Sequence, residues 1–297
     1  MTDYAMAALL GIVEGLTEFL PVSSTAHLRI AEALLRLDLA DPYWKMFTIV
    51  IQLGAVLCLP IYFAARLARF LASYPRGERG DRGLLTHPLA LVGIAFVVTA
   101  VPAFLLTKII GRQLERLDVM GLSLVVGGVV MWIVDARHAA AERRGRAAGS
   151  SITTWDVEDV SLGQAIWIGA CQILSAVFPG TSRSMATIAA GQVAGMSRAA
   201  ALEFSFLLSL PTMFVATAYD LLKSVRGAGE NPIGTSAIDA HGWATLAVGF
   251  AVSFVVAYGS VAWLMAWVRR RGFVPFAVYR IAAGGAVLAF MARLAAR

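Results

Sequence analysis

The stretch Glu14-Gly-Leu-Thr-Glu-Phe-Leu-Pro-Val-Ser-Ser-Thr-Ala-His27 sets acidic, hydroxyl and imidazole side chains inside an apolar region. The apolar region extends from about residue 4 to residue 35, and Pro21 interrupts a helix that enters it. A broken helix is tolerated at membrane depth only where protein or a wet cavity satisfies its backbone. We therefore predict that residues 4–35 form a re-entrant, broken helix of a membrane protein.

A second stretch, Pro179-Gly-Thr-Ser-Arg-Ser-Met-Ala-Thr187, interrupts another apolar region at about 161–196. One constant offset, the distance from Pro21 to Pro179, relates the two regions. At this offset the matched pairs are Gly11 with Gly169, Glu14 with Gln172, Leu16 with Leu174, Pro21 with Pro179, and Ser24 with Ser182. Broken helices at matching places in two halves of a chain indicate a binding site near the interface of the repeats.

The composition excludes an ordinary soluble domain, because 59% of the residues are hydrophobic and only 15% are charged. Soluble domains average about 45–50% and about 25% respectively. Six further apolar runs are long enough, or nearly so, to span a bilayer. They lie at about 46–65, 88–110, 119–134, 202–222, 243–268 and 273–292. The predicted fold is an all-α polytopic membrane protein with about six spanning helices and two re-entrant regions, arranged as an inverted repeat.

We predict a single membrane domain over residues 1–297, with a first repeat at about 1–135, a linker at about 136–160 and a second repeat at about 161–297. Arginines cluster in 66–87, 136–160 and 269–271, which predicts a cytoplasmic position for these segments. This topology puts the first broken region on the outer side and the second on the inner side. The net charge of +6 therefore reflects membrane-facing loops, and nucleic acid is not an expected partner.

The predicted linker ends in an acidic patch. Asp156, Glu158 and Asp159 follow a segment rich in Arg, Gly and Ser. We interpret this patch as a solvated loop without chemistry.

Glu14 and Glu18 are four residues apart, so a helix puts both carboxylates on one face, where like charges repel. Each also costs about 2.5–3.5 kcal/mol at mid-bilayer on insertion scales. A divalent cation, a shared proton or an arginine would relieve this cost. The alternative is a solvated face of an interfacial amphipathic helix.

Ser23, Ser24 and Thr25 stand where a new helix starts after Pro21, and free N–H groups and hydroxyls at such a start bind anions. His27 follows one turn after Ser24 and could act as a general base or proton donor. The alternatives are simple N-capping for the hydroxyls and a structural role for the histidine.

The second stretch adds Arg183, whose planar guanidinium fits a phosphate or a carboxylate. Gly180 allows the backbone to approach a ligand closely, and Thr181, Ser182 and Ser184 supply hydroxyls. The alternative for Arg183 is a structural salt bridge with Glu14 or Glu18. Carboxylates, hydroxyls, an imidazole and a guanidinium together are the set that phosphoryl transfer needs.

Both stretches resemble the motifs of the undecaprenyl-pyrophosphate phosphatase family of bacitracin-resistance type. The resemblance runs along nearly the whole chain. Its further segments are Ile51-Gln-Leu-Gly54, Glu203-Phe-Ser-Phe-Leu-Leu208, Phe273-Val-Pro-Phe-Ala277 and Tyr279-Arg280.

The resemblance implies hydrolysis of undecaprenyl pyrophosphate to the monophosphate carrier and phosphate, dependent on a divalent cation such as Mg²⁺ or Ca²⁺. It implies a bacterial cytoplasmic membrane protein whose site opens toward the periplasm, with the bilayer and a polyprenyl pyrophosphate as partners and a homodimer left open. Carried over by position, the catalytic residues are Glu14, Glu18, Ser24, His27 and Arg183. Glu14 and Glu18 are the expected metal ligands, and the expected substrate-binding residues are Ser23, Thr25, Gly180, Thr181, Ser182 and Ser184.

Two positions depart from the family pattern. Ala26 and Met185 stand where the family usually has glycine, and both add bulk beside the predicted phosphate site. We keep the activity, because neither change removes a reactive group.

The sequence leaves the nucleophile open. Ser24 is favoured, with His27 or Glu18 as its base, but attack by His27 or by metal-activated water fits the same residues. The rival function is a polyprenyl-phosphate flippase or transporter, because inverted repeats with broken helices are also a transporter architecture. A purely structural scaffold fits poorly with the cost of these charged groups in lipid.

Overall fold

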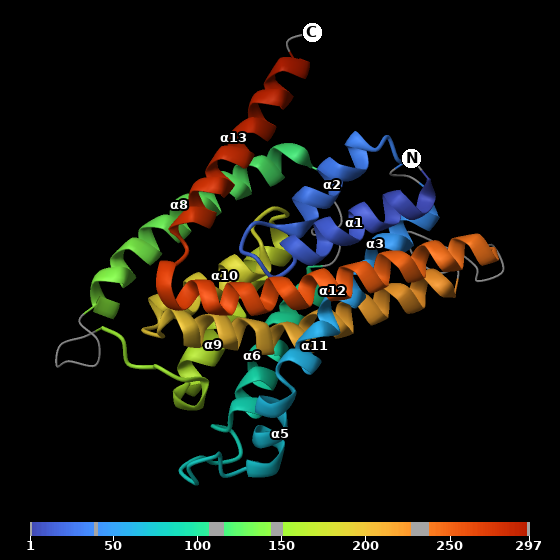
Figure 1. Ribbon diagram of the computed structural model, residues 1–297. Coiled ribbons are helices and arrows are strands. Elements are labelled where there is room, and N and C mark those ends of the chain that lie inside the picture. Colours follow the sequence, from blue (N-terminus) through green and yellow to red (C-terminus); the bar gives the residue numbers. More distant parts are fainter. Residues whose placement is uncertain (1, 39–40, 107–115, 144–150, 227–237, 296–297) are drawn as a thin grey trace. The chain divides into compact units, whose positions relative to one another are not determined.

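The computed structural model describes residues 2–38, 41–106, 116–143, 151–226 and 238–295 (Figure 1). In these ranges the chain is helical and contains no β-strand beyond an isolated bridge between Thr154 and Met196. The elements are α1 Asp3–Thr17, α2 Ser24–Leu34, α3 Pro42–Val56, α4 Cys58–Tyr62, α5 Ala64–Ser73, α6 Pro88–Leu105, α8 Leu117–Arg143, the 3₁₀ turn η1 Val157–Asp159, α9 Leu162–Val177, α10 Arg183–Val193, α11 Arg198–Val225, α12 Ala240–Arg271 and α13 Val274–Ala295.

Six segments among the described residues are long and apolar enough to cross a membrane, which confirms the predicted all-α polytopic fold. Each matches one predicted apolar run. They are Pro42–Tyr62, Pro88–Leu105, Leu117–Ala141, Arg198–Lys223, Ala240–Arg271 and Val274–Arg293. The protein is therefore a multi-pass membrane protein.

The two predicted broken regions are helical hairpins made of shorter helices. Helix α1 packs on α2, and α9 packs on α10 (Figure 1). At about 1.5 Å per residue, the 15 residues of α1 and the 16 of α9 extend for less than the roughly 30 Å of a hydrocarbon core. Their lengths fit re-entrant helices and do not fit complete spans.

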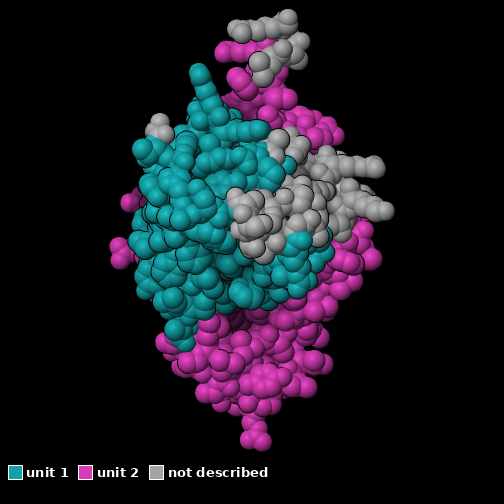
Figure 2. All heavy atoms as spheres, turned by 90° about the vertical axis from the view of Figure 1, so that its right-hand side faces the viewer, with its two compact units in different colours: residues 1–19, 24–64, 209–263 teal, residues 20–23, 65–208, 264–297 magenta. Residues whose placement is uncertain are grey.

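The chain divides into two compact units, which Figure 2 colours separately. Unit 1 contains residues 1–19, 24–64 and 209–263, and unit 2 contains residues 20–23, 65–208 and 264–297. These units mix the two halves of the sequence. The division into a repeat at about 1–135 and a repeat at about 161–297 stays a prediction.

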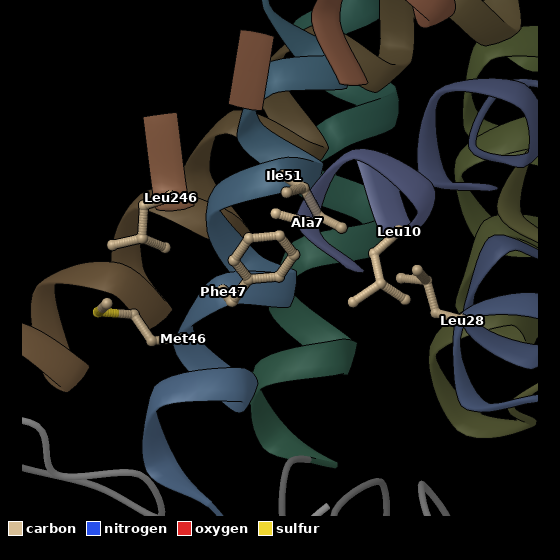
Figure 3. Packing of buried hydrophobic residues seen from close by; sticks show 7 residues of the cluster. All are labelled: Ala7, Leu10, Leu28, Met46, Phe47, Ile51 and Leu246. Atoms are coloured by element: carbon tan, nitrogen blue, oxygen red, sulfur yellow. The ribbon is translucent and has the colours of Figure 1, made fainter. Parts of the chain in front are cut away.

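A cluster of apolar side chains holds unit 1 together (Figure 3). It consists of Ala7, Leu10, Leu28, Met46, Phe47, Ile51 and Leu246, from α1, α2, α3 and α12. Helix α1 approaches α12 closely through Gly15, where an added Cβ would lie 2.7 Å from the Ser253 carbonyl oxygen. Small residues permit this kind of close helix contact in membranes. The contact fixes the helix that carries Glu14.

Unit 2 is built on α8, which packs against α13 and α10, and on α6, which packs against α9. The Thr99 hydroxyl on α6 lies 2.9 Å from the Ala95 carbonyl oxygen of its own helix and 2.7 Å from that of Gly169 on α9. A hydroxyl hydrogen bond of this kind joins helices where lipid provides no hydrophobic driving force. This contact fixes helix α9, which directly precedes the second break.

The arginine-rich segment after α4 binds the acidic end of the predicted linker in unit 2. Arg66 donates from Nε to Glu203 Oε1 at 3.0 Å and from Nη2 to Asp156. Arg79 Nη1 lies 2.6 Å from Asp159 Oδ1. The interpretation of the linker as a solvated loop therefore holds only in part at this acidic end, because Asp156 and Asp159 are half-exposed whereas Glu158 is buried.

Described residues of the three predicted cytoplasmic segments lie close together in unit 2, where Arg66 of the first pairs with Asp156 of the second. Arg269, in the third segment, is close enough to attract the Glu203 carboxylate that Arg66 binds. Beyond it, the Phe273 N–H donates to Asp135 Oδ2 at 2.9 Å, at the start of the second segment. This arrangement is the one expected of loops that share one side of a membrane.

Helix α8 extends into the predicted linker. It continues to Arg143, so residues 136–143 are helical, and the buried Asp135 just before them accepts from Arg198 Nε at 2.7 Å. The reason is intrinsic helix propensity, since residues 139–141 are alanines. Residues 144–150 of the linker, and residues 107–110 of the predicted apolar run 88–110, lie outside the described residues.

Candidate active site

Glu14 and Glu18 lie on one face of α1, as the spacing predicts. The helical backbone continues through Glu18, whose N–H donates to the Glu14 carbonyl oxygen at 2.9 Å. Their residues are 0% and 7% exposed. The break therefore begins at Glu18, the C-cap of α1, and the alternative of a solvated acidic face is wrong.

Ser24 and Glu18 meet across the break within unit 1. The Ser24 hydroxyl donates to Glu18 Oε2 at 2.6 Å, and both residues are buried. A hydrogen bond to a carboxylate is short and strong, and a hydroxyl held by a base is the arrangement of an activated nucleophile. The sequence offered His27 or Glu18 as the base for Ser24, and the structure shows a direct hydrogen bond from the Ser24 hydroxyl to Glu18.

The rest of the first motif lies on either side of Ser24. Thr25 and His27 are half-buried on α2, with His27 one helical turn after Ser24. Ser23 is buried and directly precedes α2, with a φ of 76°. This left-handed conformation is uncommon for a residue other than glycine and marks a constrained site.

The second motif forms the turn between α9 and α10 in unit 2. Gly180 has a φ of 92°, and an added Cβ would lie 2.5 Å from the Met120 carbonyl oxygen, so only glycine fits. Ser182 caps α10 by accepting from the Met185 N–H at 3.4 Å, and its hydroxyl lies 3.0 Å from that of Ser184. Arg183 is the first residue of α10 and is half-buried.

Part of the first motif packs on the second motif within unit 2. Residues 20–23 belong to this unit although their flanking helices belong to unit 1. The Ser184 hydroxyl donates to the Leu20 carbonyl oxygen at 3.1 Å. Arg280 Nη1 donates to the Pro21 carbonyl oxygen at 3.1 Å, and its Nη2 donates to those of Gly180 and Thr181 at 3.0 and 2.9 Å. The structure thus brings the two breaks together.

Arg280 is the residue to which the sequence analysis gave no role. It is fully buried on α13, inside a spanning segment. The cost of a charge in the membrane, which singled out Arg183, applies equally to Arg280. That cost could have marked Arg280 as a candidate. The backbone carbonyl oxygens that accept its hydrogen bonds could not be predicted from the sequence.

The residues with positive φ in the two breaks do not pair at the offset that relates the two sequence motifs. Ser23 and Ser182, with φ of 76° and 67°, each stand directly before the second helix of their hairpin. The sequence offset pairs Ser182 with Ser24 instead. The structural counterparts are therefore Ser23 and Ser182, because Ser182 stands three residues after Pro179 whereas Ser23 stands two residues after Pro21.

The two glutamates suit a metal ion that takes most of its ligands from water and substrate phosphates. Among the described residues there is no group of three or more His, Cys, Asp or Glu side chains that could hold a metal ion. Glu14 and Glu18 offer two carboxylates on one helix face. Mg²⁺ is commonly bound by one or two carboxylates together with waters and substrate phosphates, so this pair fits such an ion.

The two departures from the family pattern are accommodated in the interior. Ala26 and Met185 are 3% and 5% exposed. An added Cβ on Gly127 would lie 2.7 Å from the Met185 Cε, so the methionine packs against a glycine of α8. The extra bulk at Met185 is therefore taken up by Gly127.

Comparison with known proteins decides the family. The family model described as bacitracin resistance protein BacA matches residues 7–286, which include both motifs. The chain belongs to the BacA family. Its relatives match it over nearly their whole length.

Three curated relatives in this family carry the name undecaprenyl-diphosphatase. The protein from Koribacter versatilis is 64% identical over 98% of this chain and 99% of its own length. The protein from Thermus thermophilus is 43% identical over 96% and 95%, and that from Rhizobium etli strain CIAT 652 is 40% identical over 95% of both chains. The family resemblance inferred from the motifs is confirmed.

Proposed function

We propose that this chain hydrolyses undecaprenyl pyrophosphate to undecaprenyl phosphate and inorganic phosphate, as part of the recycling of the cell-wall lipid carrier. Membership in the BacA family and the names of the relatives support the proposal. The observation that carries it is the 2.6 Å hydrogen bond from the Ser24 hydroxyl to Glu18 Oε2. This contact supplies a nucleophile and a base for phosphoryl transfer.

Ser24 is the proposed nucleophile and Glu18 its general base. A bond forms between Ser24 Oγ and the terminal phosphorus, the bond from that phosphorus to the bridging oxygen breaks, and the hydroxyl proton passes to Glu18. Undecaprenyl phosphate leaves with the bridging oxygen. Water then attacks the phosphorus of the phosphoserine and loses one proton to solvent, the bond from phosphorus to Ser24 Oγ breaks, and Glu18 returns its proton to Ser24 as phosphate leaves. Attack by His27 and direct attack by water are the competing assignments, because His27 lies one turn away on the same helix.

The second motif is the proposed phosphate-binding element. The guanidinium of Arg183 suits a phosphate because its planar donors match two oxygens at once. Ser182 and Ser184 add hydroxyls at the start of α10, and the N-terminal end of a helix favours an anion. The backbone at Ser23, Thr25, Gly180 and Thr181 completes the assigned binding residues.

A divalent cation, Mg²⁺ or Ca²⁺, is the proposed cofactor. When bound by Glu14 and Glu18 it would neutralise charge on the pyrophosphate. The two buried carboxylates lie on one face of α1 and supply the oxygen ligands that such an ion prefers.

The proposed location is the bacterial cytoplasmic membrane, with the site facing the periplasm and the prenyl tail in the bilayer. The gathering of the basic segments in unit 2 supports a cytoplasmic position for them. A homodimer stays a prediction.

The test is phosphate release from undecaprenyl pyrophosphate by the purified protein in detergent, with and without a chelator. We expect metal-dependent release that Glu18→Ala and Arg183→Ala abolish while the variants stay folded. Arg116→Ala is the matched control, because Arg116 is an exposed arginine that pairs only with Asp118 among the described residues. Full activity in either site variant would remove that residue from the mechanism.

The rival flippase finds no support in the names of the relatives. If well-folded protein releases no phosphate but moves a labelled polyprenyl phosphate across vesicle membranes, the proposed hydrolysis is wrong. Release without movement across the membrane supports the phosphatase.

A further inference from the structure

Arg280 is a buried cation whose hydrogen bonds all go to backbone carbonyls. Its residue is 0% exposed on α13. Nη1 donates to Pro21, and Nη2 lies 3.2, 3.0 and 2.9 Å from the carbonyl oxygens of Ser123, Gly180 and Thr181. In the part of the chain that the structure describes, no carboxylate forms an ion pair with it.

A buried charge without a counter-ion is costly, so it needs strong compensation. Here the compensation comes from carbonyl dipoles of three separate segments, residues 21, 123 and 180–181. An apolar side chain of similar size would fill the same space without that cost. The arrangement indicates that the guanidinium has a task in shaping these segments.

The bonds fix backbone that is otherwise unfavourable. Thr181 directly precedes Ser182, and Pro21 lies two residues before Ser23, and both serines have positive φ. Such conformations cost about 1–3 kcal/mol each and persist only where surrounding contacts hold them. Arg280 supplies contacts to both breaks at once.

The same bonds orient the start of α10. In a trans peptide the C=O and the following N–H point in opposite directions. Because the Thr181 carbonyl points at Arg280, the Ser182 N–H points away from it. This places an N–H beside the first N–H groups of α10, and the start of a helix is where an anion binds.

We propose that Arg280 is a positioning residue for pyrophosphate hydrolysis, which holds both helix breaks in their strained conformation and turns the start of α10 toward the phosphate. The inference rests on the proposed function. Arg280 does not touch the substrate in this assignment; it acts through Pro21, Gly180 and Thr181.

Gly127 provides an independent way to disturb the same contact. An added Cβ there would lie 2.4 Å from Arg280 Nη2 and 2.7 Å from Met185 Cε. Gly127→Ala should therefore displace the guanidinium while its charge and all its donors remain. This variant keeps the test decisive if Arg280→Met does not fold.

The first experiment compares kcat and KM for undecaprenyl pyrophosphate in Arg280→Met, Arg280→Lys and Gly127→Ala. A small misplacement of reacting groups costs about 100-fold in rate, so we expect that loss in kcat for Arg280→Met, with KM within threefold. Arg280→Lys should recover about tenfold, because an ammonium restores donors without the planar fork. Phe276→Leu is the control, since Phe276 is a buried residue of α13 that packs on Phe273 and Trp267.

The second experiment measures amide hydrogen exchange at residues 20–23 and 180–184. We expect at least tenfold faster exchange at both breaks in Arg280→Met and Gly127→Ala, and no change there in Phe276→Leu. Unchanged exchange, or faster exchange with kcat within threefold of the unmodified protein, overturns the positioning role. If the unmodified protein releases no phosphate, the proposed function fails, and the exchange result still decides whether Arg280 holds the two breaks.

Discussion

At the residue scale, the contact between Ser24 and Glu18 turns a set of candidate groups into a defined pair. The carboxylate is buried, and the serine hydroxyl is its hydrogen-bond donor. Burying such a pair in a membrane protein costs free energy, so its presence indicates a function. The pair therefore makes the proposed nucleophilic step the first to test.

Ser24→Ala and Glu18→Gln should each lower kcat by about 10²–10⁴-fold, the usual contribution of general-base catalysis. The double variant should lose little more than the more damaging single change, because residues that act as a unit are not additive. The measurement is phosphate release under saturating substrate. Ser260→Ala, which removes a hydroxyl that donates to Val256 on α12, should leave kcat unchanged. Losses that multiply in the double variant would mean that the two groups act independently.

A second residue-scale prediction concerns His87, which caps α6. Its Nδ1 accepts from the Leu89 N–H at 3.2 Å, which requires a neutral ring. Burial, and then the charge of Arg82, lower the pKa of His87 below its ordinary value. In the unfolded chain the ring titrates near about 6.5. The cap therefore contributes fully above about pH 6.5, and this contribution is lost as the pH falls toward the lower folded pKa.

His87→Asn should flatten the fall in Tm between pH 7 and pH 5, because the asparagine oxygen can still cap the helix and does not titrate. The measurement is thermal unfolding of the detergent-purified protein across this pH range. His241→Asn, at an exposed histidine that contacts Asp3, is the control and should retain the fall. An equally steep fall in His87→Asn and in the unmodified protein would contradict the capping argument.

The candidate residues that the sequence revealed share one property, the cost of a polar or charged group in an apolar region. This cost pointed to Glu14, Glu18 and Arg183 without any knowledge of their partners. It did not lead to Arg280, because one buried arginine in a long apolar run carries no spacing pattern. Its acceptors are carbonyls from residues far apart in the chain, and every residue has a carbonyl.

At the element scale, the helix breaks were predictable because Pro21 and Pro179 cannot continue a helix, and both breaks occur there. The register between the two breaks was not, since it depends on one extra residue between the proline and the positive-φ serine of the second break. The end of α8 was also missed, because charge marked the membrane boundary but alanines carried the helix past it. Composition predicts where a helix leaves the hydrocarbon core better than it predicts the last residue of that helix.

Gly15→Ala tests the element that carries Glu14 and Glu18. Its Cβ would lie 2.7 Å from the Ser253 carbonyl oxygen and 2.8 Å from the Ala257 nitrogen, both backbone atoms of α12. Helix α1 must then move away from α12, at a cost of about 1–3 kcal/mol. We expect a lower Tm and a lower kcat. Gly259→Ala, on α12 with open space around its Cβ, should leave both unchanged. An unchanged kcat in Gly15→Ala would show that α1 need not sit this close for catalysis.

At the scale of the whole molecule, the topology depends on which ends of the spanning helices face the cytoplasm. The basic segments 66–87, 136–160 and 269–271 gather in unit 2, through Arg66, Glu203 and Arg269. Positive charge near helix ends selects the cytoplasmic side. That this side is cytoplasmic stays a prediction from the sequence, and the ion pairs add a reason for these loops to stay together.

Helix α8 gives this topology a direct test, because Arg116 and Arg137 flank its apolar run at 119–134. The 21 residues from one to the other rise about 31 Å, enough to cross the hydrocarbon core. In a background without Cys58 and Cys171, we expect Arg137→Cys to react with an impermeant thiol reagent only from the cytoplasmic side. Arg116→Cys should react only from the outside. Arg79→Cys and Arg270→Cys should behave like Arg137→Cys. Labelling of the 116 and 137 variants from one side would mean that α8 does not cross, and a consistent reversal would place the basic segments outside and overturn the proposed orientation.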